Sequence, residues 1–133
     1  MVALMRTADL VRRHASALLE PHGLTLQQYN VLRILRGAGK DGLPTLTVAE
    51  RLIEQTPGIT RLIDRLETKG MVRRERPEQD RRQVYCFITK TGMDLLATLD
   101  PEVERVAKRI MQHVTKTEMQ SFLAILEKIR DAE

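Results

Sequence analysis

Apolar residues in the middle of the chain recur at helical spacing. Four of them stand at positions i, i+3, i+4 and i+7: Ile59, Leu62, Ile63 and Leu66. This spacing predicts an amphipathic helix with one buried face. The opposite face is polar apart from one proline and carries Pro57, Thr60, Arg61, Asp64, Arg65 and Thr68. A helix held on one side, with arginines and short polar side chains on the other, is suited to the DNA major groove. The pattern therefore predicts that this helix reads DNA.

Local signals predict where this helix and the one before it begin and end. Thr56 followed by Pro57 is a cap with proline at the first helical position, and Gly70 ends the helix. Upstream, Thr47 and Glu50 form a capping-box pattern that opens a short helix. The residues expected to be buried in it are Val48, Ala49, Leu52 and Ile53. Two helices joined by a tight turn predict a helix-turn-helix.

The spacing of apolar residues changes to that of strands after Gly70. Residues 71–76 and 84–88 predict a two-stranded hairpin around an arginine-rich loop, that is, a wing. In the second strand Val84, Cys86 and Ile88 share one face. We therefore expect Cys86 to be a buried apolar thiol rather than a redox switch.

The first part of the chain is predicted to be helical. Residues 2–19 carry a heptad-like apolar stripe. Thr25 and Gln28 form a capping box that opens a second helix, over residues 26–35. Three glycines are expected to break that helix into a loop: Gly37, Gly39 and Gly42. The segment 43–46 is compatible with a small strand but is too short to assign.

The last part of the chain is predicted to form two more helices. Thr89 caps a long one, in which Pro101 predicts a kink or a break near Asp100. Thr115 and Glu118 form a capping box for the final helix. The helices at both chain ends carry more apolar surface than one small domain can cover, which favours pairing with a second copy.

Composition and charge narrow the possible functions. The chain has 133 residues, about one domain, and a net charge of +4. Its basic residues gather on the predicted reading helix and hairpin: Arg61, Arg65, Lys69, Arg73, Arg74, Arg76, Arg81 and Arg82. This field suits phosphate binding, with a solvated charged face as the alternative. The single cysteine, and the lack of a signal peptide or of an apolar run long enough for a membrane, predict a cytoplasmic protein with no membrane role.

Three stretches of the sequence resemble the MarR family, the multiple antibiotic resistance regulators. They are LTLQQYNVLRIL, TVAERL and TPGITRLIDRLETKGMVRRERPEQDRRQVYCFITKTG. The most specific part runs from IDRLETKG through the DRR of the hairpin loop to IT-K-TG. Members of this family are winged helix-turn-helix repressors that bind DNA as homodimers. We therefore expect a single domain over residues 1–133, with a DNA-binding lobe at 24–96 and dimerisation helices at 2–19 and 94–132.

The resemblance implies roles for the matching positions. Those expected nearest DNA are Gln55, Thr56, Gly58, Thr60, Arg61 and Arg65 on the reading helix, and Arg81 and Arg82 on the wing. Arg82 would enter the minor groove, where narrowing concentrates negative potential, and Asp80 would help to hold the loop. A surface ion pair between Asp80 and Arg82 is the alternative interpretation.

The resemblance also implies a small-molecule effector, aromatic or lipophilic, bound between two lobes. His14, Tyr29 and Arg33 are candidate contacts because their polar tips lie near the expected lobe junction, with core packing as the alternative for Tyr29. The histidines lack the spacing of metal ligands, so we expect no metal and no cofactor. No set of residues suggests a nucleophile with an oriented base and acid, so an enzyme is not expected.

The predicted fold is mainly α: a winged helix-turn-helix with terminal helices forming a dimerisation lobe and a two-stranded β-hairpin wing. The predicted function is a homodimeric transcriptional repressor that binds a pseudo-palindromic operator in double-stranded DNA and is released by a small molecule. Two alternatives stay open, a metal-responsive sensor-regulator and a winged-helix module for protein contacts.

Overall fold

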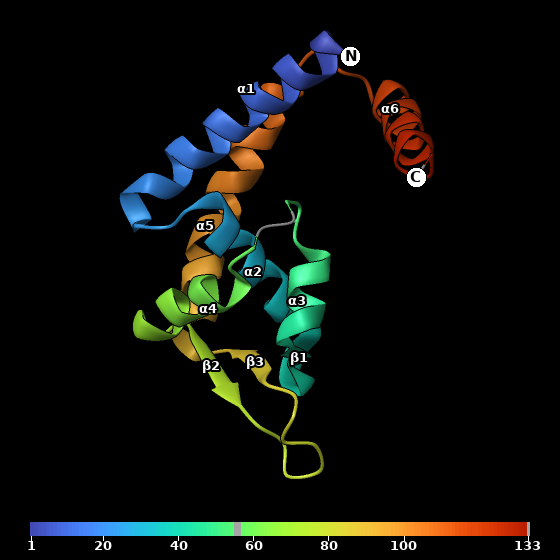
Figure 1. Ribbon diagram of the computed structural model, residues 1–133. Helices are drawn as coiled ribbons and strands as arrows, with labels where there is room; N and C mark the ends of the chain where they lie inside the picture. Colours follow the sequence, from blue (N-terminus) through green and yellow to red (C-terminus); the bar gives the residue numbers. More distant parts are fainter. Residues whose placement is uncertain (55–56, 133) are drawn as a thin grey trace.

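A small sheet with three helices around it forms the lower lobe of the molecule in Figure 1. The computed structural model describes residues 1–54 and 57–132. The helices of the lobe are α2 (Leu26–Ala38), α3 (Thr45–Arg51) and α4 (Ile59–Thr68). The sheet is antiparallel with the order β1-β3-β2, formed by β1 (Leu43–Pro44), β2 (Val72–Glu75) and β3 (Tyr85–Ile88). The loop between β2 and β3 projects from the bottom of the lobe as the predicted wing (Figure 1).

Long helices from both ends of the chain lie above this lobe. α1 (Val2–Leu19) packs along α5 (Lys90–Ile110), and α6 (Lys116–Arg130) stands apart from both (Figure 1). Short 3-10 turns at Glu20–His22 and Gly39–Asp41 follow α1 and α2. Across the described parts of the chain, no helix combines the length and apolar character needed to cross a membrane.

Side-chain caps begin three of the helices where the sequence predicts them. Thr25 Oγ1 accepts a hydrogen bond from Gln28 N at 3.1 Å, and Gln28 Oε1 accepts one from Thr25 N, also at 3.1 Å. Thr115 and Glu118 make the same reciprocal pair at α6. Thr89 Oγ1 accepts from Gly92 N at the start of α5. These caps satisfy backbone N–H groups that a helix start otherwise leaves free.

One apolar core joins the lobe to the lower ends of the long helices. Its members are Leu19, Leu24, Tyr29, Val31, Leu32, Leu35, Val48, Leu52, Ile63, Leu66, Val72, Cys86, Leu96 and Leu99. Cys86 is fully buried, as its place in the strand predicts, and burial raises the pKa of its thiol. The core therefore fixes α4 from behind and leaves its other face outward.

The start of α3 differs from the prediction. The helix begins at Thr45, without a side-chain cap, so the capping box predicted at Thr47 and Glu50 is wrong. Thr45 instead donates from both its N–H and its hydroxyl to the carbonyl of Val84, at 2.9 and 3.0 Å. This contact joins residues distant in sequence, so local patterns do not reveal it. Because α3 ends at Arg51, Ile53 lies beyond it and is 75% exposed, not buried as predicted.

The reading helix also begins later than predicted. α4 starts at Ile59, and Pro57 lies in the turn before it rather than at the first helical position. Gly58 precedes the helix with φ at 134°, a backbone conformation that side-chain-bearing residues rarely adopt. The predicted cap Thr56 lies outside the described residues, as does Gln55. At its other end the helix stops before Gly70, which has φ at 73° as a helix-ending glycine does.

Two predicted breaks in the helices are absent. Gly37 lies inside α2, which continues to Ala38, so the loop begins later than expected. α5 continues through Pro101, although proline removes one backbone hydrogen bond, so of the kink or break predicted near Asp100 the break is absent and the kink stays a prediction. Leu96 and Leu99 before the proline are fully buried and Val103 after it packs on the core, so packing on both sides stabilises the continuous helix.

Candidate nucleic-acid interface

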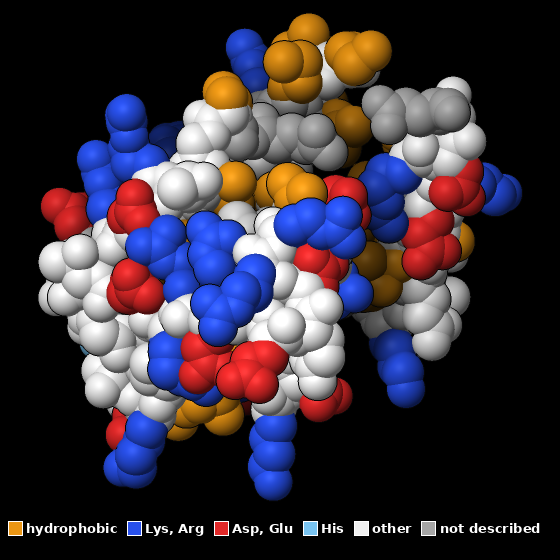
Figure 2. Space-filling view, turned by 60° about the horizontal axis from the view of Figure 1, so that its bottom comes forward, with side chains coloured by type: hydrophobic (Ala, Val, Ile, Leu, Met, Phe, Trp, Pro, Cys, Tyr) orange, Lys and Arg blue, Asp and Glu red, His pale blue; other side chains and the backbone are white. Residues whose placement is uncertain are grey.

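The outer face of α4 is polar and exposed, as its spacing predicts. Ile63 and Leu66 are fully buried, whereas Thr60, Arg61, Asp64 and Arg65 are exposed on the opposite side. Figure 2 turns the wing end of the molecule toward the viewer and shows lysine and arginine side chains gathered there, interspersed with carboxylates. The structure therefore brings the predicted positions Gly58, Thr60, Arg61 and Arg65 together at one surface.

Two open hollows lie beside α4. One of about 690 Å³ is lined by Gln27, Pro57, Gly58, Thr60, Arg61, Leu62, Asp64 and Arg65. The other, about 490 Å³, is lined by Gly23, Thr25, Gln28, Arg61, Asp64, Arg65, Thr68 and Lys69. Both place the start of α2 next to the arginines of α4, so a ligand against α4 would also meet α2.

At this surface the sequence analysis missed Gln27 and named Lys69 only for its charge. Gln27 of α2 lines the larger hollow. Lys69 Nζ at the end of α4 donates to the carbonyl oxygen of Gly23 and lies 3.5 Å from Gln28 Oε1. Only the basic character of Lys69 was a signal in the sequence, because its partners come from a distant turn.

An ion-pair cluster at the surface joins β2 of the wing to α4. Arg74 Nη2 on β2 lies 2.5 Å from Asp64 Oδ1 and 2.9 Å from Glu67 Oε1. The backbone N–H of Arg74 also donates to Glu67 Oε2 at 3.2 Å. These hydrogen bonds lower the pKa of Glu67 and raise that of Arg74, because each charge stabilises the other.

The wing loop is held by its own side chains. Asp80 Oδ1 accepts hydrogen bonds from the backbone N–H and the Nε of Arg82, both at 3.1 Å. Arg76 Nη1 donates to the carbonyl oxygen of Arg81 at 2.8 Å. Asp80 thus contacts both the backbone and the side chain of Arg82, and that side chain is 92% exposed; the entry of Arg82 into the minor groove stays a prediction.

The candidate effector residues lie in different surroundings. Tyr29 is 7% exposed and belongs to the core, and burial raises the pKa of its phenol. Its ring lies 5.9 Å from the guanidinium carbon of Arg33. His14 is on α1, with Nδ1 at 3.4 Å from Arg109 Nη2 of α5. The structure therefore brings Tyr29 and Arg33 together, and His14 belongs to the contact between α1 and α5.

An apolar cavity of about 140 Å³ lies between α1, α2 and α5. It is lined by Val11, Ala15, Leu18, Leu19, Tyr29, Val103, Val106, Ala107 and Ile110. Neither His14 nor Arg33 is among its lining residues. Within residues 1–54 and 57–132, no three His, Cys, Asp or Glu side chains come together as metal ligands.

Comparison with known proteins agrees with this geometry. A family model described as transcriptional regulator SarA/Rot matches residues 13–99. The chain is similar to the homoprotocatechuate degradative operon repressor of Escherichia coli, with 28% identity over 95% of this chain and 84% of that protein. It is 34% identical to the regulator TtmR of Methylorubrum extorquens over 97% of this chain and 64% of that protein. A solved MarR transcription factor from Planctomyces limnophilus has 35% identity and a TM-score of 0.75, covering 95% of this chain and 91% of that chain.

The matched family and the winged helix-turn-helix fold are those of DNA-binding regulators of transcription, which are not enzymes. The chain belongs to the MarR and SarA/Rot family of such regulators. The family and the mainly helical winged fold that the sequence predicts are both confirmed.

Proposed function

We propose that the chain is a homodimeric repressor that binds a pseudo-palindromic operator and is released by an aromatic or lipophilic small molecule. The observation that carries the proposal is the common surface formed by α4 and the wing. Arg61 and Arg65 project from a helix face that is held from behind by the core, and Arg82 is exposed on the adjoining loop. A helix for the major groove beside an arginine for the minor groove is a DNA-reading arrangement.

The terminal helices support the homodimer. Apolar side chains of α1 and α6 are exposed: Val2, Leu4, Met5, Leu10, Val11, Phe122, Leu123, Ile125 and Ile129. None of the residues of α6 that the structure describes is buried. Large exposed apolar patches mark interaction surfaces, and a two-fold partner would cover the same patch on each copy. The proposed dimer would present two equivalent α4 helices, with half-sites about 10 base pairs apart, centre to centre.

The apolar cavity supports an effector bound where the terminal helices meet the lower lobe. Its walls come from the terminal helices α1 and α5 and from Tyr29 of α2 in the lobe, so an occupant would contact both the terminal helices and the lobe. An apolar lining favours an aromatic or aliphatic ligand. The Escherichia coli operon repressor is similar to this protein over 95% of the chain, which supports repression as the direction of control.

Selection of bound sequences from random double-stranded DNA tests the proposal. We expect recovery of an inverted repeat, binding that weakens steeply with salt, and a dimer in sedimentation at micromolar concentration. Sequence-independent binding, or a stable monomer, would contradict the proposal. Binding insensitive to salt would favour a protein-contact module instead.

A further inference from the structure

Arg74 lies where the reading helix and the wing meet. Its guanidinium and backbone N–H contact Asp64 and Glu67, which stand three residues apart on α4 and therefore project from adjacent turns of one face. Two acceptors on the helix and two donors on the strand restrict both the rotation and the tilt of α4 relative to β2. Each hydrogen bond alone is modest, but Nη2 of Arg74 contacts both carboxylates while its backbone N–H holds the second oxygen of Glu67, so the contacts act together.

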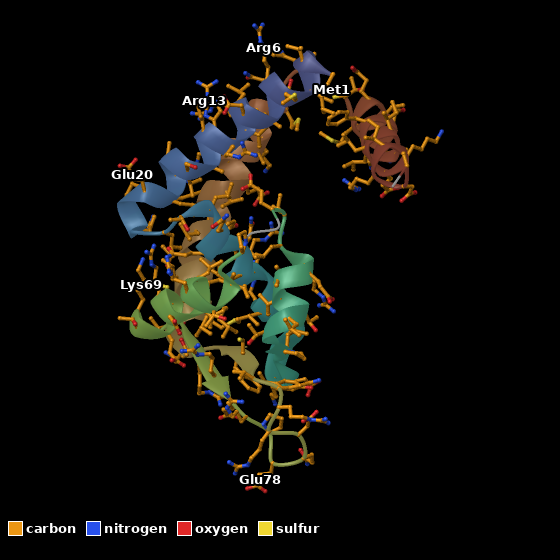
Figure 3. The ribbon with its side chains drawn as sticks, viewed as in Figure 1. Met1, Arg6, Arg13, Glu20, Lys69 and Glu78 are labelled. Atoms are coloured by element: carbon orange, nitrogen blue, oxygen red, sulfur yellow. The ribbon has the colours of Figure 1, made fainter. Side chains whose placement is uncertain are left out.

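The strand that carries Arg74 continues directly into the wing. β2 ends at Glu75, and the next residue, Arg76, donates to the carbonyl of Arg81 inside the loop. Arg81 precedes Arg82, which Asp80 braces from the other side. A continuous set of contacts therefore runs from α4 through Arg74 and Arg76 to the exposed arginine of the wing. In Figure 3 this path connects the end of α4, marked by Lys69, with the wing tip, marked by Glu78.

The surroundings of Arg74 differ from those of an arginine that contacts a ligand. The side chain of Arg74 is 27% exposed and has two carboxylate partners, whereas that of Arg82 is 92% exposed. Leaving those carboxylates would place two negative charges beside the phosphates. The geometry therefore favours a role through other residues rather than direct contact with DNA.

We propose that Arg74 is a positioning residue that fixes the wing relative to α4, so that Arg61 and Arg82 meet DNA as one preformed surface. The inference rests on the DNA-reading roles proposed above for these two arginines. Without Arg74, the wing must be ordered when DNA binds, and that cost reduces what Arg82 contributes. Arg61, held on α4 by the core, keeps its contribution.

The test compares the effect of Arg82→Ala in two backgrounds. In the parent we expect Arg82→Ala to weaken DNA binding about tenfold, a typical size for one arginine contact. In the Arg74→Met background the same change should weaken binding less than about threefold, while Arg61→Ala should retain its full effect. General loss of stability would reduce both effects together, so the split between them reports positioning. Equal retention of both effects would overturn the proposal.

Two matched variants separate positioning from charge. Arg73→Met removes the same charge from the neighbouring position of β2, where the guanidinium lies over Phe87 at 4.4 Å, and should leave the tenfold effect of Arg82→Ala intact. The double variant Asp64→Asn, Glu67→Gln keeps Arg74 but removes its ionic partners, and should reduce the effect of Arg82→Ala as Arg74→Met does. If this double variant keeps the full effect, Arg74 acts only by neutralising charge and the proposal is wrong.

A measurement without DNA judges Arg74 independently of the proposed function. Spin labels at Thr68→Cys and Gln79→Cys, with the buried Cys86 replaced by alanine, report the distance from α4 to the wing. We expect a narrow distance distribution with Arg74 and a broader one with Arg74→Met. An unchanged distribution would overturn the inference. If Arg82→Ala has no effect in the parent, the role proposed for Arg82 fails, and the distance distribution alone decides on Arg74.

Discussion

The lower lobe and the terminal helices differ in how deeply their apolar residues are buried. In the lobe, Ile63, Leu66 and Val48 are completely buried and the outer face of α4 is polar. On α6, Leu123, Ile125 and Ile129 are all more than half exposed. A fold completed within one chain does not leave such a helix in water, because exposed apolar area is unfavourable. The contrast between the buried core residues and the exposed apolar residues of α6 supports the homodimer proposed above, in which a second copy would cover the terminal helices.

Placing charged residues on the apolar face of α6 should have the largest effect on assembly and DNA binding. We expect Leu123→Asp with Ile129→Asp to give a monomer. Operator binding should weaken by about 100-fold or more, because one molecule can then no longer bind both half-sites at once. Sedimentation and DNA titration measure the two effects. Lys128→Ala, an exposed polar change on the same helix, is the control and should stay dimeric. A dimer that survives the double variant would place the interface elsewhere.

Replacing one leucine by alanine in the lobe and one in α6 should change the free energy of unfolding differently. Leu66→Ala in the lobe core should lower the free energy of unfolding by about 2–5 kcal/mol, because it leaves a cavity. Leu123→Ala should cost much less at protein concentrations where the monomer dominates, and more where the dimer forms. Urea unfolding at several protein concentrations distinguishes the two. A cost for Leu123→Ala that does not vary with concentration would contradict our interpretation of α6.

Within the lobe, the helix and the wing should contribute differently to DNA recognition. Arg61→Ala should cost about 1–3 kcal/mol and relax the preference at one position in each half-site, as loss of a guanine contact does. Arg82→Ala should weaken binding to many sequences alike and reduce the salt slope. Titrations over a salt series with operator and altered half-sites measure both. Arg61→Ala losing affinity equally for all sequences, with Arg82→Ala unchanged, would reverse these roles.

The smallest expected effect is the pH dependence of the contact between Glu67 and Arg74. In the folded chain the pKa of Glu67 is lowered from 4.5, so this contact stabilises the fold fully above that value. Stability from it is lost as the pH falls through the lowered folded pKa. We therefore expect the parent to lose stability relative to Glu67→Gln below about pH 4.5, by a few tenths of a kcal/mol for a partly exposed pair. Urea unfolding of both proteins from neutral to acidic pH measures this, and parallel curves would contradict it.

Features that the sequence predicts correctly depend on nearby residues. The caps at Thr25, Thr89 and Thr115 each involve a partner three residues away, and the alternation around Cys86 is a property of a single strand. The apolar spacing of α4 likewise requires only its own ten residues. Local chemistry of this kind determines where α2, α5 and α6 begin and which face α4 buries.

What the sequence did not reveal depends on contacts between distant residues. Thr45 begins α3 because it binds the carbonyl of Val84, 39 positions away. Lys69 donates to the carbonyl oxygen of Gly23, and Arg74 pairs with carboxylates of α4. The spacing of residues along the chain does not predict these contacts. It therefore predicted a basic surface but not the contacts that hold its side chains in place. The DNA contacts assigned to individual residues, and the effector contacts of His14, Tyr29 and Arg33, remain predictions.

The unbroken course of α5 through Pro101 has a mechanical consequence. At its base Thr89 donates to the carbonyl oxygens of both Gly70 and Met71, so the helix is joined to the end of α4 and the beginning of the wing segment. Its 21 residues span about 31 Å. A rigid rod of that length converts a tilt of about 10° at one end into a displacement of about 5 Å at the other. If the proposed effector tilts α5 as one body, a small angular change among the terminal helices would become a large change in the position of the reading helix.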